Sequence, residues 1–392
     1  MMRPTSVYRL SAALIVMLLM LLNQLQARDL SIRLFASTKP ESAIFVAVSG
    51  QYTLELPGVS PIALSPGDQL LIYRYGDRIA VKTGSIPAMA VDSLRVRGTT
   101  GSRFSLSTVG ATAQKRIYDD GLHCRNSHGI FLFLNETTIE KYLPGVVRTE
   151  GGPGRHAEFN KTQSVITRTF AYRNLEKHLS DGYNICDDVH CQAYHGITDD
   201  TAIIAAAKAT EDVVITGRDS VLILAAYHSN CGGETASASE AWVTDLPYLK
   251  KIVDPYCLTS RNAVWRTSIP VVEWKDFLVR SGYNGDLNNP LLLAFSQQAT
   301  RKQHYEPVAG LRIPVVAIRN EFGLRSSFFT LTPSGDSLSI NGRGYGHGVG
   351  LCQEGAIEMA IRGNTFNQIV SFYYSNVMLL DIKNAKSPPL VY

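Results

Sequence analysis

The pattern of hydrophobic and polar positions divides the chain into a strand-rich first part and a second part that contains helices. From residue 30 to about 135, short apolar or alternating runs are separated by Gly, Pro and Asp, which is typical of strands joined by turns. Strands are expected at 31–36, 43–48, 52–56, 70–75 and 130–134. The sequence therefore predicts a β-rich N-terminal region over residues 28–120.

Helical patterns begin after this region. Thr138 is expected to cap a short turn that Pro144 and Gly145 end, because neither residue favours helix continuation. Longer helices are expected at 158–177, at 201–210, from 353 to 362 and from 366 onward. Residues 258–314 have a weaker pattern and predict an inserted lobe around a helix near Trp274.

The first 27 residues are typical of a targeting segment. Arg3 and Arg9 precede an apolar run from Ala12 to Leu22, which is short for a membrane span and suits the core of a signal peptide. Cleavage after Ala27 is one interpretation, and an uncleaved membrane anchor is the other. Because no later stretch could cross a bilayer, the remainder is expected to be exported, to the periplasm or cell envelope.

Composition and charge exclude some classes of function. The 392 residues are 45% hydrophobic and 18% charged, as in ordinary globular proteins, and they suffice for one large or two moderate domains. The net charge of +4 is small and lies partly at the N-terminus. Without a concentrated basic face, nucleic-acid binding is not expected.

The segment HSNCGG at 228–233 ends an apolar run, 221–227, that predicts a strand. His228, Ser229 and Asn230 offer donors and acceptors, and the two glycines leave the backbone accessible to a ligand. A tight turn with a satisfied histidine is the alternative. Nucleophilic catalysis by the Ser-His pair is disfavoured, because adjacent residues of a strand point to opposite faces and no nucleophile elbow is present.

A second glycine-rich segment, NGRGYGHGVGLCQEGA, covers residues 341–356. Glycine at every second position predicts a strand with one bare face, open to a glycan or to another backbone. Arg343, Tyr345, His347 and Val349 would line the other face. The segment lacks the Lys-Ser/Thr of a phosphate loop, so a nucleotide site is disfavoured.

Four segments in a fixed order resemble one family. They are YLPGVVRTE at 142–150 with KTQSVITRTFAY at 161–172, then HSNCGG at 228–233, FGLRSSFFT at 322–330 and the glycine-rich run at 341–356. Together they resemble the stage II sporulation protein D family, which comprises lytic transglycosylases of peptidoglycan and related amidase-enhancer proteins. The resemblance covers residues 30–385 and is strongest at these segments.

The resemblance implies an exported lytic transglycosylase that cleaves the bond between N-acetylmuramic acid and N-acetylglucosamine and leaves 1,6-anhydromuramic ends. Glu150 is the expected general acid and then base. A second carboxylate is unnecessary, because the C6 hydroxyl of the muramic acid attacks C1 from within the same sugar. At the end of an apolar strand, Glu150 would lose hydration and its pKa would rise. A carboxylate on a surface loop is the alternative, and Gly151 replaces the methionine that is usual in the family.

The implied fold is mixed α+β, with the β-rich N-terminal part packed against a helix-containing catalytic part, over 121–385, around a substrate groove. By resemblance, the substrate-binding residues are Gln163, Arg168, Tyr194, His228, Ser229, Asn230, His347, Gly348 and Gln353. A structural ion pair is the alternative for Arg168, and a packing role is the alternative for His347.

The implied partners are glycan strands already stripped of stem peptides and, second, a cell-wall amidase. A non-catalytic amidase enhancer that binds the wall is therefore the alternative function. A zinc amidase in its own right is disfavoured, because no open His/Glu site is evident.

His178, Cys186 and Cys191 are the candidate metal ligands. Two thiolates and an imidazole within 14 residues suit tetrahedral zinc, and the resemblance implies zinc near the groove. His190 adjoins Cys191, and an extended backbone would direct the two side chains apart. A Cys186–Cys191 disulfide is the alternative in an oxidising compartment.

Three further cysteines lie in or near the resembling segments. Cys231 and Cys352 stand where serine is commoner in the family, and Cys257 follows shortly after Trp242. A Cys231–Cys257 disulfide that braces the groove is a further hypothesis.

Overall fold

The structure is a computed structural model that describes residues 29–84, 86–110, 113–127, 129–242, 245–297 and 301–387. The expected signal peptide or anchor at 1–27 lies outside these residues. Within them, no helix has both the length and the apolar character that a membrane crossing requires. The chain forms two compact units: the first holds residues up to Glu150 together with Asn174–Asp200, and the second holds Gly151–Arg173 and the residues from Thr201 onward. The predicted mixed α+β class is confirmed.

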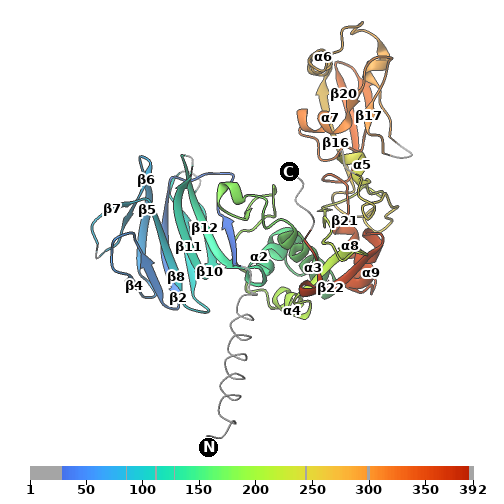
Figure 1. Cartoon of the computed structure of the whole chain (residues 1–392). Helices are drawn as coiled ribbons and strands as arrows, with labels where there is room; N and C mark the ends of the chain where they lie inside the picture. Colours follow the sequence, from blue (N-terminus) through green and yellow to red (C-terminus); the bar gives the residue numbers. More distant parts are fainter. Residues whose placement is uncertain are drawn as a thin grey trace, which may run out of the picture. The chain divides into compact units, whose positions relative to one another are not determined.

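Two sheets of the first unit pack face to face and form its core (Figure 1). The ring of Phe45 in one sheet lies 5.4 Å from that of Tyr52 in the other, centroid to centroid. The seven-stranded sheet has the order β13 (Ile185–Cys186), β1 (Asp29–Arg33), β12 (Ile130–Thr138), β11 (Gly121–Ser127), β8 (Ser93–Gly98), β3 (Tyr52–Glu55) and β4 (Ile62–Leu64). The six-stranded sheet has the order β10 (Lys115–Asp119), β9 (Arg103–Thr108), β2 (Ser42–Ser49), β5 (Gln69–Tyr75), β6 (Arg78–Lys82) and β7 (Met89–Val91).

Strand β1 connects the start of the described chain to the first candidate site. It pairs antiparallel with β12 and parallel with β13, and Arg33 lies opposite Cys186. The polar segment 187–200 therefore leaves the edge of this sheet at a fixed position.

All five strands expected from the sequence are present here as β1, β2, β3, β5 and β12.

Helix α2 (Ile139–Gly151) begins where β12 ends and corrects the prediction of a short turn there. Pro144 and Gly145 lie inside this helix rather than at its end. A proline inside a helix costs about 3 kcal/mol, but Tyr142, Leu143 and Val146 are fully buried. Each such side chain contributes about 1.5–3 kcal/mol when it leaves water, so packing outweighs the proline.

Around the core of the second unit, the described residues form α-helices and two short strand pairs. The helices are α3 (Ala157–Arg173), α4 (Thr201–Ala209), α5 (Ala238–Ala241), α8 (Gln353–Ile361) and α9 (Phe366–Tyr373), and the 3-10 turn η4 (Ile382–Asn384) follows. The pairs are β14 (Val213–Gly217) with β22 (Val377–Asp381) and β15 (Tyr227–His228) with β21 (Leu351–Cys352). The helices expected at 158–177, 201–210, 353–362 and from 366 are confirmed as α3, α4, α8 and α9, although α3 ends at Arg173. The strand expected over 221–227 is wrong, because only Tyr227 and His228 form one.

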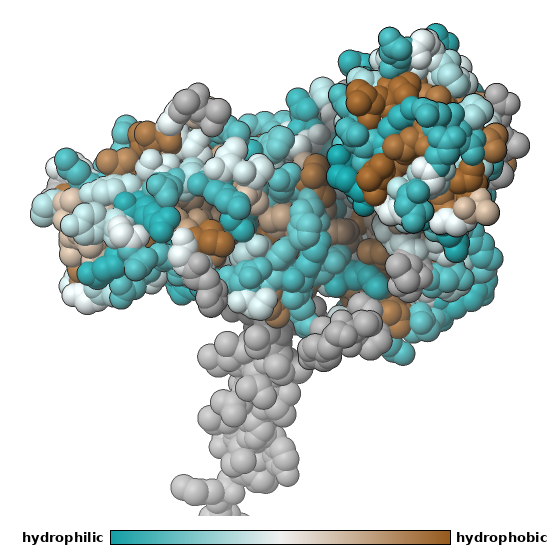
Figure 2. Space-filling model, turned by 90° about the horizontal axis from the view of Figure 1, so that it is seen from above, coloured by the Kyte–Doolittle hydropathy of each residue, from teal (hydrophilic) through white to brown (hydrophobic). Residues whose placement is uncertain are grey.

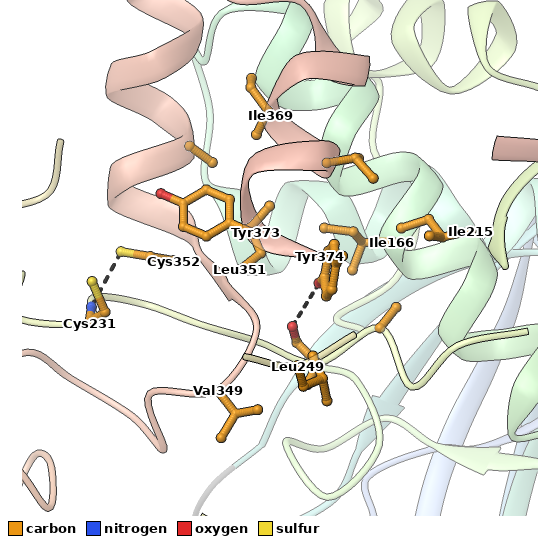
Figure 3. Packing of buried hydrophobic residues seen from close by; sticks show 14 of the residues in the cluster. Ile166, Ile215, Cys231, Leu249, Val349, Leu351, Cys352, Ile369, Tyr373 and Tyr374 are labelled. Atoms are coloured by element: carbon orange, nitrogen blue, oxygen red, sulfur yellow. Dashed lines mark hydrogen bonds between the residues drawn. The ribbon is translucent and has the colours of Figure 1, made fainter. Parts of the chain in front are cut away.

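The core of the second unit lies between α3, α8 and α9. Ile166, Ile215 and Ile369 lie in this core together with Leu351 and Tyr374 (Figure 3). Helix α9 begins with a capping box, in which the Thr365 hydroxyl accepts from the Gln368 N–H and the Gln368 side chain accepts from the Thr365 N–H. The capping box therefore fixes the start of α9.

A lobe with its own hydrophobic core belongs to the second unit. Its strands are β16 (Val264–Pro270), β20 (Ser337–Arg343), β19 (Phe329–Ser334), β17 (His304–Tyr305) and β18 (Ile313–Pro314). Its helices are α6 (Val271–Arg280), which contains Trp274, α7 (Val315–Glu321) and the 3-10 turn η3 (Pro290–Leu293). The buried cluster runs from Trp265 to Ile340, so the lobe extends beyond the expected end at 314. Figure 2 shows hydrophobic areas interleaved with hydrophilic ones on the visible surface.

Candidate functional site

Glu150 lies in the last turn of α2. The sequence predicts the end of an apolar strand at this position, and that prediction is wrong. The helix is held against the segment 192–196 by close packing. A Cβ on Gly145 would lie 2.2 Å from the carbonyl oxygen of Gly196 and 2.6 Å from the Tyr194 ring. Gly145 therefore serves a close approach of two segments, and it does not serve a turn.

Glu150 is half-buried. Its Oε1 accepts a hydrogen bond from the Ala193 N–H at 2.8 Å. One residue earlier, the Thr149 hydroxyl accepts from the His195 N–H at 3.4 Å. The segment after Cys191 thus orients the carboxylate.

Four ligand groups converge in the same region, and we call His178, Cys186, His190 and Cys191 the His/Cys cluster. Their ligand atoms all lie within 4.8 Å of one another. Cys191 Sγ lies 3.5 Å from His178 Nε2, and His190 Nδ1 lies 3.8 Å from Cys186 Sγ and 3.7 Å from Cys191 Sγ. Two thiols and two imidazoles in this arrangement fit a tetrahedral zinc site.

His190 corrects one expectation from the sequence. Residues 189–191 form a turn, and the backbone is not extended there. The turn brings His190 and Cys191 to the same point, so the cluster gains a fourth ligand group. Cys186 and Cys191 are free thiols, so the alternative disulfide is not formed.

Electrostatics within the His/Cys cluster favour one thiolate. A hydrogen bond from Cys186 is the main cause that lowers the pKa of Cys191 to about 6, and Lys177 contributes to this shift. Cys186 donates this hydrogen bond to Cys191, and the bond, together with burial, raises the pKa of Cys186. His178 Nδ1 lies 3.2 Å from the Asp181 carboxylate, an outer contact that commonly fixes a metal-bound histidine.

Tyr194 is a core residue in the structure. Its side chain is 1% exposed, and its ring lies 4.8 Å from Tyr142 and 5.7 Å from Tyr118. Next to it, Gln192 Oε1 accepts from the Tyr142 hydroxyl at 3.2 Å. A ring buried in this way offers no surface to a sugar, so the predicted substrate role of Tyr194 finds no support.

The glycine-rich run of the second unit is a loop, and the predicted strand ends at Arg343. Gly344, Gly346, Gly348 and Gly350 all have positive φ, between 71° and 110°. A Cβ on Gly350 would lie 2.1 Å from the Ala226 carbonyl oxygen. The alternating glycines therefore let this run cross segment 226–232 at backbone contact.

This crossing brings His228 and His347 together, with ring centroids 5.4 Å apart. His347 Nδ1 accepts from the Val349 N–H at 3.0 Å, and Nε2 lies 3.0 Å from the Tyr227 carbonyl oxygen. His228 Nδ1 lies 3.1 Å from the Val349 carbonyl oxygen. Its Nε2 is buried and has no hydrogen-bond partner among the described residues. Each carbonyl needs a ring N–H, so His228 Nε2 is left as an open acceptor.

Burial keeps both rings neutral. It lowers the pKa of His347 to about 4. For His228, burial is again the main cause that lowers the pKa, with His347 and Arg301 as further causes. The second unit thus holds a neutral imidazole pair.

Ser229 is half-buried, while Asn230 is buried and fully engaged. The Asn230 side chain donates to the Cys257 carbonyl at 3.1 Å and to Glu354 at 2.6 Å, and its Oδ1 accepts from the Gly232 N–H at 2.7 Å. Asn230 therefore holds the loop together.

Gln163 and Gln353 contact each other from α3 and α8, with Gln353 Nε2 donating to Gln163 Oε1 at 3.3 Å. Arg168 is fully buried. Its guanidinium donates to the carbonyl oxygens of Val213 at 3.1 Å and Ala207 at 3.3 Å. Arg168 thereby links the last turn of α4 to the start of β14, and its predicted contact with glycan stays a prediction.

A second cluster was not predicted as a metal site, and we call Cys231, Asp254, Cys257 and Cys352 the thiol cluster. All four residues are buried, and their ligand atoms lie within 4.8 Å of one another. Cys231 Sγ lies 3.4 Å from Cys257 Sγ, and all the cysteines are free. The hypothesised Cys231–Cys257 disulfide is therefore not formed, and the cluster could hold a metal.

Comparison with known proteins gives one family match and several relatives. A family model described as SpoIID, Stage II sporulation protein, matches residues 127–216. Stage II sporulation protein D of Bacillus subtilis (strain 168) is 26% identical over 256 residues, which are 62% of this chain and 74% of that protein. Its namesake from Bacillus amyloliquefaciens is 29% identical over 267 residues, 64% of this chain and 75% of that protein.

A third relative has a different name. The amidase enhancer of Bacillus subtilis (strain 168) is 24% identical over 288 residues, which are 60% of this chain and 40% of that protein. The residues matched by the family model include Glu150 and the His/Cys cluster, whereas His228 and His347 lie beyond them.

Proposed function

Because the chain belongs to the SpoIID family, as its four segments predict, we propose that it is an exported lytic transglycosylase of peptidoglycan. The family is associated with cell-wall remodelling. The observation that carries the proposal is the half-buried Glu150, inside the matched segment, whose Oε1 is held by the Ala193 N–H. Export rests on the apolar N-terminal segment of the sequence.

In the proposed reaction, Glu150 donates a proton to the glycosidic oxygen as the bond from C1 of the muramic acid breaks. The carboxylate then takes the proton from the C6 hydroxyl as its oxygen bonds to C1, which gives the 1,6-anhydro ring. Proton transfer by a positioned group contributes about 10²–10⁴-fold, and the intramolecular hydroxyl replaces a second carboxylate. One oriented carboxylate is therefore sufficient for this chemistry.

Zinc at the His/Cys cluster would support this role without taking part in it. Its four groups suit a closed structural site, and the same segment continues to Ala193, which holds Glu150. The ion would supply a fixed tetrahedral crosslink for that segment. The orientation of Glu150 would then depend on the metal.

The test is digestion of peptidoglycan, with and without stem peptides, by the purified full chain. Wild type is expected to release anhydromuramic ends, and Glu150→Gln to reduce their rate about 10²–10⁴-fold. Glu140→Gln, in the first turn of the same helix, is the matched control and should retain activity. Mass spectrometry of the products measures all three. If folded wild type releases no anhydro ends, the proposal is wrong.

The alternative is a non-catalytic amidase enhancer, which the relative of that name favours. In that case the chain would bind wall glycan and raise the activity of a cell-wall amidase. Wild type and Glu150→Gln would then stimulate the amidase equally. Unequal stimulation together with anhydro products supports the enzyme instead.

A further inference from the structure

The thiol cluster draws its members from three separate segments of the second unit. Cys231 follows the His228 strand, Asp254 and Cys257 belong to a loop, and Cys352 stands at the N-terminal cap of α8. Cys231 and Cys352 are 121 residues apart in the chain. The four groups therefore converge only through the tertiary fold.

We propose that the thiol cluster is a second metal site, which binds a thiophilic divalent ion such as Zn²⁺ through three sulfurs and one carboxylate oxygen. Tetrahedral zinc with Zn–S bonds of about 2.3 Å places sulfur atoms about 3.8 Å apart. The Cys231 and Cys257 sulfurs already lie 3.4 Å apart, and Asp254 Oδ2 lies 3.2 Å from Cys231 Sγ. Small shifts of the side chains would complete the coordination.

A buried carboxylate among thiols is costly as an anion unless a positive charge offsets it. Asp254 is fully buried, and in the described part of the chain no Lys, Arg or His forms an ion pair with it. The Asp254 carboxylate accepts hydrogen bonds from Cys231 Sγ, from the Tyr256 N–H and from the Tyr373 hydroxyl. A divalent cation would offset part of the negative charge of this carboxylate and of the thiolates, whose burial without a partner is costly.

The surroundings already provide the outer contacts of a metal–thiolate site. Cys352 Sγ accepts from the N–H groups of Cys231 at 3.3 Å and Gly355 at 3.4 Å. The Tyr373 hydroxyl donates to Asp254 Oδ2 at 2.9 Å and fixes its orientation. Figure 3 shows Cys231 and Cys352 at the margin of the hydrophobic core, beside Tyr373. Such contacts stabilise thiolates inside an apolar core.

A disulfide is a weaker interpretation of the same residues. It would bring two of the three sulfurs to about 2.05 Å and would leave a third thiol buried beside an uncompensated carboxylate. A metal uses all four groups at once. The ion would crosslink the loop after His228, the loop at 254–257 and the start of α8. It would thus fix the segment that carries the histidine pair, whether or not Glu150 is catalytic.

The experiment counts metal in the full chain purified without chelator. Inductively coupled plasma mass spectrometry should show that Cys257→Ser carries one zinc fewer per chain than wild type. Cys124→Ser is the matched control, because Cys124 is equally buried but belongs to neither cluster. It should carry the same zinc content as wild type. An unchanged zinc content in folded Cys257→Ser would overturn the proposal.

A second variant keeps the proposal testable if Cys257→Ser does not fold. Asp254→Asn retains all three thiols and should bind Co²⁺ at least about 10-fold more weakly at this site. Sulfur-to-cobalt charge-transfer absorption measures that binding. Unchanged cobalt affinity would contradict the proposal. A Cys231–Cys257 disulfide in non-reduced peptide maps of wild type would also contradict it.

Discussion

The two clusters use similar ligand groups but are built in opposite ways. The His/Cys cluster comes from one short segment, and its His190 is exposed. The thiol cluster comes from three distant segments, and all its members are buried. The first cluster depends on a local turn, whereas the second depends on the whole second unit. Perturbing the fold should therefore affect them unequally.

The largest expected effect comes from the crossing that assembles the thiol cluster. Gly350→Ala places a Cβ 2.1 Å from the Ala226 carbonyl oxygen at a residue with φ of 71°. The left-handed conformation alone costs about 1–2 kcal/mol, and the clash adds to it. We expect the free energy of unfolding of the second unit to fall by more than about 3 kcal/mol, as measured by urea denaturation.

A control substitution at Gly363 separates the cost of the steric clash at Gly350 from the cost of the left-handed backbone conformation. Gly363 has φ of 87° but no atom within 4 Å of its would-be Cβ, so Gly363→Ala should cost only about 1–2 kcal/mol. The zinc proposed at the His/Cys cluster should be retained in both variants. Equal destabilisation by the two substitutions would show that backbone contact at the crossing is unimportant.

These residues also show what sequence patterns can and cannot predict. His178, Cys186 and Cys191 lie within 14 residues, so their spacing alone predicted the first cluster. His190 was missed because adjacent residues were assumed to lie on an extended backbone. The thiol cluster left no local spacing, because its members lie in three distant segments of the chain.

Packing explains the remaining differences. A glycine at every second position fits a strand with a bare face, but it fits equally well a loop in which every second residue has positive φ. Close contact between Gly350 and Ala226 decides in favour of the loop, and no local pattern contains that contact. In the same way, Pro144 predicts a helix end from the local sequence. The helix continues because Tyr142 and Val146 are buried.

Acid should lower the free energy of unfolding through the histidine pair beside the thiol cluster. The pKa of His347 falls from an unfolded value near 6.5 to about 4 because the ring is buried, and nearby Arg319 and Arg301 also disfavour its charge. A lowered histidine pKa gives stability that is present above pH about 6.5 and is lost as the pH falls toward 4. The loss from His347 is about 3 kcal/mol.

The matched measurement compares wild type with His347→Gln across this pH range. Because glutamine does not titrate, the difference in free energy of unfolding between the two proteins should shrink as the pH falls from 6.5 to 4. Taking the difference removes the contribution of carboxylates common to both. Parallel curves would contradict a neutral His347 with a lowered pKa.

The smallest expected effects come from the outer partners of the two clusters. Tyr373→Phe removes a buried hydrogen bond to Asp254, and hydrogen bonds to charged groups contribute about 1.5–3 kcal/mol. Asp181→Asn removes the partner of His178, but the Asp181 side chain is 56% exposed, where such pairs contribute under about 1 kcal/mol. Thermal unfolding should therefore show a clear loss for Tyr373→Phe and a marginal one for Asp181→Asn. A larger loss for Asp181→Asn would mean that the His/Cys cluster depends more on its outer hydrogen bond than the thiol cluster does. That result would contradict the comparison drawn between the two clusters.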